Sequence, residues 1–344
     1  MRLLIFGAGA IGSYVGGHLA QAGHHVTFVA RPAAAAVLQA QGLRIHDGRA
    51  ATTFTVRNFA VAPSAAQAFL DGAYHCVVLA IKSFDTAAAL DELTAAAPQP
   101  LPVLCLQNGV DNEAEIARVL GPEGVIAGTV TTPVSKPAEG EILVEKQRGL
   151  GIALGHPLST GLVEACNAAG LRTRAYPAAG PMKWSKLFTN LIGNATAAIL
   201  DLPVAAVYAD ARLFAVEAAL LRECVAVMRA YGYPVVNLPG VPVRPLAWAA
   251  TRWPAALARP LLLRVVGAGR GTKRPSLHVD LHAGRARSEV GWLHGAVARH
   301  GAGLGVPTPV NRVLTETLEA LHAGALRIED FRRQPEALLR RLAA

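Results

Sequence analysis

The chain of 344 residues is poor in aromatic residues and contains no long uninterrupted apolar segment. Arginine and proline interrupt its most apolar stretch, residues 258–268, well short of the roughly 20 residues that a membrane-spanning helix needs. A membrane protein is therefore not expected. An N-terminal export signal is also disfavoured, because three glycines between residues 7 and 12 would break its apolar segment. We expect a cytoplasmic protein.

Cysteine is scarce, and no pair has the CxxC spacing of a metal or redox site. The four cysteines are Cys76, Cys105, Cys166 and Cys224. We interpret them as reduced, structural thiols. His278 and His282 stand four residues apart, so one helix face could carry both, but no third ligand has a motif-like spacing and an HEXXH motif is missing. The sequence therefore predicts no metal site.

Acidic residues are fewer than basic ones, and the formal net charge is +9. A basic protein can bind nucleic acid. Here, however, the arginines are scattered along the C-terminal half without interleaved aromatic residues or a nucleic-acid-binding motif. An anionic cofactor and an anionic substrate would account for part of the positive charge. We expect neither a nucleic-acid partner nor a membrane partner.

The start of the chain contains the most informative motif. Residues 1–6 form an apolar run typical of a buried strand, and residues 13–21 have a helical pattern. Between them stand Gly7, Ala8, Gly9, Ala10, Ile11 and Gly12, a G-x-G-x-x-G sequence. In this strand–turn–helix context the motif indicates dinucleotide binding. The glycines allow a tight turn and a close backbone approach, and the helix N-terminus holds the pyrophosphate.

The next strand-like run indicates which dinucleotide binds. Residues 25–29 end just before Arg31, and no acidic residue stands there to accept hydrogen bonds from a ribose 2′-hydroxyl. A guanidinium suits a 2′-phosphate through its charge and forked donors. We therefore predict NADP(H) as the cofactor. The alternative is an ordinary solvated arginine at the end of the strand.

The order of apolar and helical segments predicts two domains. Up to residue 176, strand-like runs alternate with helical patterns, as in a doubly wound α/β sheet. The later runs are residues 76–81, 102–106, 125–130, 141–144 and 151–154. Helical patterns then cover residues 183–200, 212–231, 276–300 and 311–323. We predict an α/β fold with an N-terminal Rossmann-type domain over residues 1–178 and an all-helical C-terminal domain over residues 179–344.

One segment interrupts the helical domain. Residues 237–275 are rich in proline, arginine and glycine. This composition is compatible with a lid, an oligomer contact or a plain surface insertion. The oligomeric state is likewise open between a monomer and a homodimer.

Polar residues follow two of the strand-like runs. Lys82 follows residues 76–81, and Asn108 follows residues 102–106. Ligands of an open α/β sheet bind beyond the carboxyl ends of its strands, so we expect these side chains where cofactor and substrate meet. Lys82 would neutralise a phosphate or carboxylate, and the Asn108 amide can both donate and accept. The alternative is that Asn108 and Gly109 form only a turn.

A second polar group stands in the helical half. Lys186, Asn190 and Asn194 are spaced by four residues, which would place them on one helix face among apolar neighbours. A partly desolvated lysine is a suitable proton donor near neutral pH. The alternative is an exposed polar stripe. Farther along, Ser276 is a candidate helix N-cap and Asp280 a charge in the following turns.

Together these motifs resemble the ketopantoate reductase (2-dehydropantoate 2-reductase) family over nearly the whole chain. The matching elements are the glycine motif, Lys82-Ser83, Gln107–Gly109, Lys186–Asn194, Ser276…Asp280…Glu289 and Val306–Asn311. The resemblance implies that NADPH reduces a small 2-oxo acid, 2-dehydropantoate, in a cleft between a Rossmann domain and a helical domain.

The resemblance also implies roles by position. Lys186 would be the general acid, and Glu289, a second catalytic residue, would help to hold cofactor and substrate. The implied cofactor-binding residues are Gly7–Gly12, Arg31, Lys82, Asn108, Val134 and Glu289. The implied substrate-binding residues are Asn108, Lys186, Asn190, Asn194 and Ser276. The chemistry is consistent with this, because an ammonium stabilises the negative charge that hydride addition creates on a ketone oxygen.

The stretch before residue 296 departs from the family pattern. From Asp280 to Glu289 it is one residue longer than usual, which on a continuous helix would rotate the later residues by about 100°. His294-Gly295 replaces the usual Asn-Gly, and Lys273 to Pro275 stand where a polar substrate contact is common. Three alternatives therefore stay open: another 2-oxo acid, a 3-hydroxyacid-type substrate, and a non-catalytic NADP(H) sensor.

Overall fold

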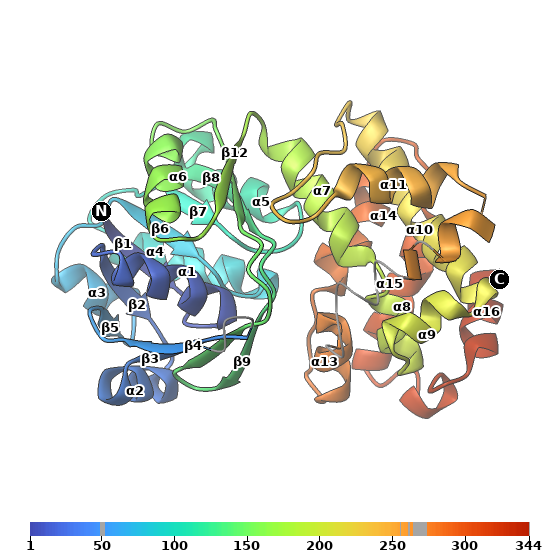
Figure 1. Ribbon diagram of the computed structural model, residues 1–344, viewed down its shortest axis with the longest axis horizontal. Coiled ribbons are helices and arrows are strands. Elements are labelled where there is room, and N and C mark those ends of the chain that lie inside the picture. Colours follow the sequence, from blue (N-terminus) through green and yellow to red (C-terminus); the bar gives the residue numbers. More distant parts are fainter. Residues whose placement is uncertain (49–51, 255, 261, 264–273, 344) are drawn as a thin grey trace. The chain divides into compact units, whose positions relative to one another are not determined.

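The computed structural model describes residues 1–48, 52–254, 256–260, 262–263 and 274–343 (Figure 1). The chain divides into two compact units. The first comprises Met1–Gln107, Asp111–Lys183 and Leu238–Val241, and the second comprises Asn108–Val110, Trp184–Asn237 and Pro242–Ala344. The domain limits inferred from the sequence, at residues 178 and 179, stay a prediction. Lys273 and the other undescribed residues of segment 237–275 lie outside the described part.

An eight-stranded sheet organises the first unit, in the order β12-β11-β8-β7-β6-β1-β2-β5. Its strands are β1 (Arg2–Phe6), β2 (His25–Val29), β5 (Ala60–Ala62), β6 (Cys76–Leu79), β7 (Val103–Cys105), β8 (Val125–Val130), β11 (Leu150–Ala153) and β12 (Thr173–Tyr176). Neighbours pair in parallel from β5 through to β8, and β11 pairs with β8 antiparallel. The predicted Rossmann-type sheet is confirmed.

Helices cover both faces of this sheet. They are α1 (Ala10–Gln21), α2 (Pro32–Gln41), α3 (Ala65–Leu70), α4 (Thr86–Ala96), α5 (Asn112–Leu120) and α6 (Ser159–Ala168), with short 3₁₀ turns at Ser83–Asp85 and Pro122–Gly124. Leu3 and Ile5 belong to the core beneath α1, α2 and α6, whereas Leu4 and Phe6 belong to the core beneath α3, α4 and α5. Because successive strand residues point to opposite faces, a strand covered on both sides is continuously apolar.

A second, four-stranded sheet corrects the prediction for residues 141–144. Its order is β4-β3-β10-β9. The strands are β3 (Leu43–Asp47), β4 (Thr52–Val56), β9 (Val134–Ala138) and β10 (Glu141–Val144). We assigned residues 141–144 to the main sheet, but β10 pairs with β3 and β9. Alternation cannot reveal the partner of so short a strand, because register depends on long-range pairing.

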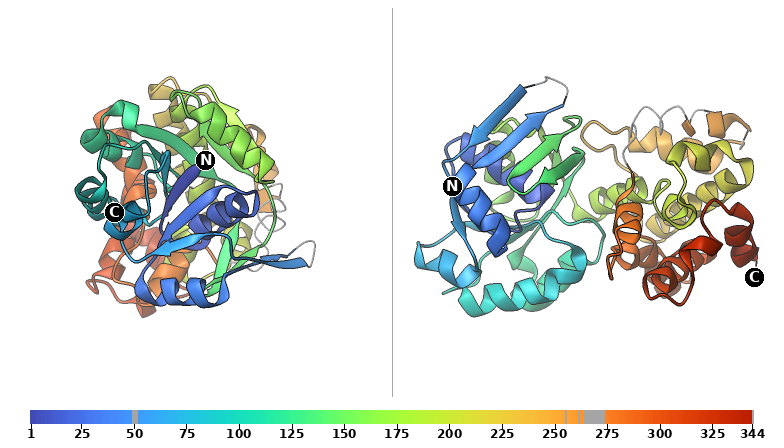
Figure 2. Two further views of the ribbon diagram at one scale, coloured as in Figure 1. Left: turned by 90° about the vertical axis from the view of Figure 1, so that its left-hand side faces the viewer. Right: turned by 90° about the horizontal axis from the view of Figure 1, so that it is seen from below.

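The second unit is helical in its described residues (Figure 2). Its helices are the C-terminal part of α7 (Ala179–Leu191), then α8 (Ala195–Leu200), α9 (Val204–Ala209), α10 (Ala211–Ala230), α11 (Val243–Arg252), α13 (Ser276–His282), α14 (His294–Gly303), α15 (Pro309–His322) and α16 (Pro335–Ala343), with 3₁₀ turns at Val290–Trp292 and Ile328–Asp330. This confirms the predicted helical domain. No helix in the described part of the chain is long and apolar enough to span a membrane.

Two predicted helices are each broken in two. The helix expected over residues 183–200 ends at Leu191 and restarts at Ala195. Between them Gly193 has φ +58°, and a Cβ there would overlap Val204. The helix expected over residues 276–300 ends at His282, because Gly284 adopts φ +66° in a Schellman motif. In that motif the N–H groups of residues 284 and 285 donate to the carbonyl groups of residues 281 and 280. Both glycines were visible signals for these helix ends.

Candidate functional site

The glycine motif forms the tight turn between β1 and α1. Gly7 has φ +107°, and a Cβ on Gly12 would overlap the carbonyl oxygen of Gly7. The turn lies beside the end of β2, since the Gly7 N–H donates to the carbonyl of Val29 at 3.2 Å. Helix α1 begins here without an acidic residue in its first turn. Free backbone N–H groups and the positive end of the helix dipole are what a pyrophosphate needs.

One cationic side chain at this turn was missed by the sequence reasoning. Lys136 on β9 donates from Nζ to the carbonyl of Ala8 at 3.1 Å and pairs with Glu139 at 2.5 Å. Because the second sheet was not predicted, no sequence signal placed β9 beside the glycine turn.

The other predicted cofactor residues of the first unit also follow or begin strands. Arg31 is exposed one residue beyond Ala30 and precedes α2, in which Pro32 is the first residue. Lys82 is half-buried after β6, at the start of a 3₁₀ turn. Val134 is buried at the start of β9. Strands β1, β2 and β6 are parallel neighbours, so Gly7, Arg31 and Lys82 follow the same edge of the sheet.

Specific side-chain contacts and one glycine conformation define the Gln107-Asn108-Gly109 turn, which follows β7. Gln107 is buried, and its Nε2 donates to Thr86 Oγ1 at 2.9 Å. Gly109 has φ +96°, a conformation that favours glycine. Asn108 Oδ1 accepts a hydrogen bond from Asn190 Nδ2 at 3.0 Å. The Asn-Gly pair therefore does form a turn, and its asparagine also contacts α7.

The polar face of α7 holds two of the three expected residues. Lys186 and Asn190 lie on α7, one turn apart and both half-buried. Asn194 is not on that helix, because α7 ends at Leu191, so the expectation of one continuous face was wrong for this residue. Asn194 stands just before α8 and is 4% exposed. Its Nδ2 donates to the Asn190 carbonyl at 2.9 Å, and its Oδ1 accepts from the Leu277 N–H at 3.2 Å.

The residues around α13 correct two further expectations. Ser276 is exposed and is the first residue of α13, so Pro275, not Ser276, holds the N-cap position. Glu289 is 4% exposed and lies in the connection between α13 and α14. The additional residue before Glu289 therefore falls outside a helix and does not rotate one. Asp280 is buried and pairs with Arg285 at 2.6 Å, which makes it a structural charge.

His294, which stands where the family usually has asparagine, belongs to a buried hydrogen-bond network. His294 Nδ1 lies 2.8 Å from Asn311 Oδ1, and burial lowers the pKa of His294 to about 4. Asn311 Nδ2 donates to Glu223 Oε2 at 2.7 Å. The same carboxylate accepts the N–H groups of Val310 and Asn311 at the start of α15. The asparagine of the VPTPVN segment thus has a packing role.

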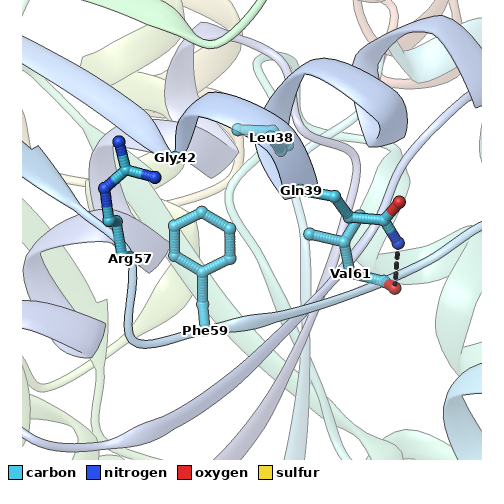
Figure 3. Close-up of a pocket in the computed structure, with 6 residues that line it drawn as sticks. All are labelled: Leu38, Gln39, Gly42, Arg57, Phe59 and Val61. Atoms are coloured by element: carbon cyan, nitrogen blue, oxygen red, sulfur yellow. Dashed lines mark hydrogen bonds between the residues drawn. The ribbon is translucent and has the colours of Figure 1, made fainter.

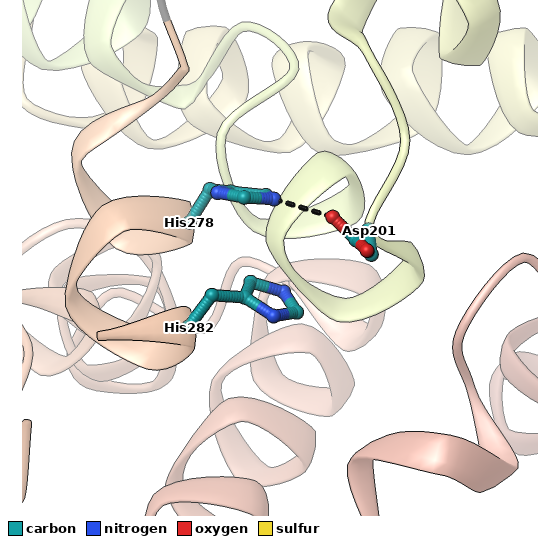
Figure 4. Close-up of side chains that lie close together, drawn as sticks. All are labelled: Asp201, His278 and His282. Atoms are coloured by element: carbon teal, nitrogen blue, oxygen red, sulfur yellow. Dashed lines mark hydrogen bonds and ion pairs between the residues drawn. The ribbon is translucent and has the colours of Figure 1, made fainter. Parts of the chain in front are cut away.

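The structure supplies a third side chain beside the two histidines. Asp201, His278 and His282 have potential ligand atoms within 4.8 Å of one another (Figure 4). Asp201 Oδ1 lies 2.7 Å from His278 Nε2, and His282 Nε2 lies 3.0 Å from the Ala198 carbonyl. The guanidinium groups of Arg274 and Arg332 are 3.5 and 3.6 Å from the Asp201 carboxylate, respectively. These cations and hydrogen bonds favour a polar anchor between α13 and α8 over a cation site.

A surface pocket of about 190 Å³ lies elsewhere in the first unit (Figure 3). It is lined by Leu38, Gln39, Gly42, Arg57, Phe59 and Val61. These residues belong to the C-terminal end of α2 and to the segment that enters β5. Because β5 is parallel to β2, that segment lies at the amino edge of the sheet, opposite the edge that carries the glycine turn. We therefore do not assign this pocket to the dinucleotide.

Comparisons with known proteins agree with this arrangement. The profile of the family "Ketopantoate reductase PanE/ApbA" matches residues 3–155, and that of its C-terminal domain matches residues 180–322. A 2-dehydropantoate 2-reductase of Mesorhizobium japonicum is 30% identical over 338 residues, covering 90% of this chain and 94% of its own. One from Halobacterium salinarum is 28% identical, covering 92% of this chain and 97% of its own.

Solved structures show the same fold. A PanE/ApbA family ketopantoate reductase from Ralstonia eutropha JMP134 superposes with a TM-score of 0.79 at 28% identity, covering 94% of this chain and 99% of that one. A D-mandelate dehydrogenase solved with NADH and anilino(oxo)acetate gives a TM-score of 0.76 at 19% identity, with the same coverage.

The fold and these matches define an oxidoreductase that acts on a CH–OH/C=O group. The chain belongs to the ketopantoate reductase family.

The contacts of Asn194 generate a testable prediction. We expect Asn194→Ala to lower the free energy of unfolding by about 2 kcal/mol, because it removes two hydrogen bonds and leaves the buried Leu277 N–H without its acceptor. Denaturant unfolding measures this. Asn237→Ala is the control, since the bond that Asn237 Oδ1 accepts from the Arg244 N–H is exposed. An unchanged midpoint for Asn194→Ala with a raised substrate KM would show a binding role alone.

Proposed function

We propose that the protein reduces 2-dehydropantoate to pantoate with NADPH and that Lys186 donates the proton. One observation carries this proposal: the hydrogen bond from Asn190 Nδ2 to Asn108 Oδ1. Asn190 is one turn beyond Lys186 on α7, and Asn108 follows β7 at the carboxyl edge of the sheet. The bond therefore brings the lysine-bearing helix to the turn where a ligand of this fold is expected. Family membership and the names of the relatives support the same substrate.

The first unit fits a dinucleotide. The turn at Gly12 has no room for a side chain, and the N–H groups at the start of α1 suit a pyrophosphate. In the proposal Lys82 adds a cation at the same edge, and the backbone of Val134 meets the nicotinamide end. Arg31 supports NADPH over NADH, because its exposed guanidinium follows β2 where an NAD site usually has an acid.

The chemistry needs one cation and several hydrogen bonds near the carbonyl group. Bound NADPH would supply the hydride that adds to the carbonyl carbon. The Lys186 ammonium would stabilise the negative charge that develops on the carbonyl oxygen and then transfer a proton to it, giving a 2-hydroxy acid. Lys186 would recover its proton from solvent.

The remaining residues of the second unit would hold the substrate. We assign Asn108, Asn190 and Ser276 to its carboxylate and hydroxyl groups, and Glu289 to contacts with cofactor and substrate. Asn194 bonds to the carbonyl of Asn190 and to the N–H of Leu277, which adjoins Ser276. Its contribution to substrate binding would thus be to hold Asn190 and Ser276 in place.

The cofactor assignment predicts a selective loss of affinity. Arg31→Ala should weaken NADPH binding by about 10- to 100-fold, the worth of a charge-assisted hydrogen bond, and leave NADH binding nearly unchanged. Fluorescence titration with both cofactors measures this. Arg57→Ala is the control, because Arg57 is exposed in the same unit near the amino edge of the sheet. Equal losses for NADPH and NADH would contradict the role of Arg31.

The catalytic assignment predicts a loss in turnover. Lys186→Ala should lower kcat by about 10²- to 10⁴-fold, because the ammonium acts mainly in the transition state. Stopped-flow or steady-state absorbance of NADPH gives kcat, and titration gives the dissociation constant of NADPH, which should not change. Arg340→Ala, which removes an exposed cation on α16, is the control. A normal kcat with a large rise in KM would make Lys186 a binding residue only.

A further inference from the structure

The buried ammonium of Lys183 has no role in the function proposed so far. It lies on α7 one turn before Lys186, and its side chain is 4% exposed. Nζ is 2.7 Å from Glu113 Oε1 and donates to the carbonyl oxygens of Gln107 at 2.8 Å and Gly128 at 3.3 Å. An ammonium has three N–H donors; two are donated to these carbonyls, and the Glu113 carboxylate neutralises the charge.

Lys183 stays charged at neutral pH. Burial has the largest single effect and lowers its pKa, but the interactions with Glu113 and Cys105 together outweigh burial, and the pKa of Lys183 is raised. The group therefore does not exchange protons in the working pH range. Its contribution must come from the three groups that it holds.

The three partners of Lys183 belong to three separate segments of the chain. Gln107 follows β7, Gly128 is in β8, and Glu113 is in the first turn of α5. A buried ion pair is often no more stabilising than an apolar pair of the same volume. Stability alone therefore does not explain the pair. What an apolar pair cannot supply is a hydrogen bond to the Gln107 carbonyl, directly before Asn108.

A second hydrogen bond fixes α7 on the C-terminal side of Lys186. Residues 183, 186 and 190 share one face of α7, because they are spaced i, i+3 and i+7. Lys183 bonds to Gln107, and Asn190 bonds to Asn108, the next residue. The segment of α7 that carries Lys186 is thus fixed at both ends to consecutive residues of the same turn.

We propose that Lys183, neutralised by Glu113, is a positioning residue that sets the placement of the Lys186 ammonium relative to Asn108. This inference rests on the proposed function. Catalysis by an ammonium depends on its position, and a displacement of about 1 Å can cost as much as 10²-fold in rate. Lys183 contacts neither substrate nor cofactor in this account. It acts through the turn and the helix that it ties together.

The experiment separates positioning from stability with two variants. Lys183→Met combined with Glu113→Leu removes the ammonium and the carboxylate together, so no uncompensated charge is buried. Glu113→Gln alone removes the carboxylate but leaves the Lys183 amino group, which can still donate to both carbonyls. Glu223→Gln is the matched control, because Glu223 is a buried carboxylate that caps α15 and lies outside this cluster.

We expect the changes in kcat among the variants not to parallel the changes in melting temperature. Well below the melting temperatures, the double variant should lose about tenfold or more in kcat, while Glu113→Gln and Glu223→Gln stay within about twofold of the starting protein. The dissociation constant of NADPH should be unchanged in all three variants. A folded double variant with normal kcat would overturn the inference. So would losses of kcat that parallel the loss of melting temperature across the three variants.

Hydrogen exchange tests the same point without activity. In the double variant, or in Lys183→Gln if the double variant does not fold, amides of residues 184–191 and 107–110 should exchange faster while those of α10 do not. Unchanged exchange in these two segments would overturn the inference. If the starting protein reduces no 2-oxo acid, the proposed function fails, and the exchange result alone decides whether Lys183 fixes α7 to the turn.

Discussion

The attachment of α7 to the Gln107-Asn108-Gly109 turn is the constraint on which the candidate site depends. Lys183 bonds to Gln107 and Asn190 bonds to Asn108, so two turns of one helix are fixed to two consecutive residues. Lys186 lies between these anchors. A flexible lysine side chain is a useful acid only where its backbone is held, and here helix geometry and buried hydrogen bonds hold it. The proposed catalysis therefore depends on individual hydrogen bonds, and each of them can be tested by substitution.

The doubly wound sheet explains why the polar residues gather as they do. Parallel neighbours bring the ends of β1, β2 and β6 to one edge, with the glycine turn, Arg31 and Lys82 beyond them. The sheet is covered by apolar side chains on both faces, and Arg31 and Lys82 lie past the strand ends. Lys136 reaches the same edge from the second sheet and contacts the carbonyl of Ala8. Cationic side chains from three separate segments of the sequence therefore lie at the edge that carries the glycine turn.

Much of the fold followed from the sequence because its signals are local. Apolar runs predicted six of the eight strands of the main sheet, but not β5 and β12, and the glycine motif predicted the first turn. Contacts between distant segments were not predictable. The second sheet joins β3 to β10 across about a hundred residues, and Lys183 meets Glu113 and Gln107 only after folding. Asn194 was wrongly placed on the helix of Lys186, although Gly193, which has φ +58° just after α7, was visible in the sequence. The proximity of Asp201 to the two histidines also depends on distant segments, so the sequence did not predict it.

The substrate remains the most consequential assignment, since the stretch before Glu289 departs from the family pattern. The structure places the additional residue in a non-helical connection, which removes one reason to expect a displaced Glu289. The most direct measurement is NADPH consumption with 2-dehydropantoate and with 2-oxo acids of smaller and larger side chains. The account predicts the highest kcat/KM for 2-dehydropantoate, with a 2-hydroxy acid as the product. Tight NADPH binding together with no NADPH consumption in the presence of any of these acids would contradict the account.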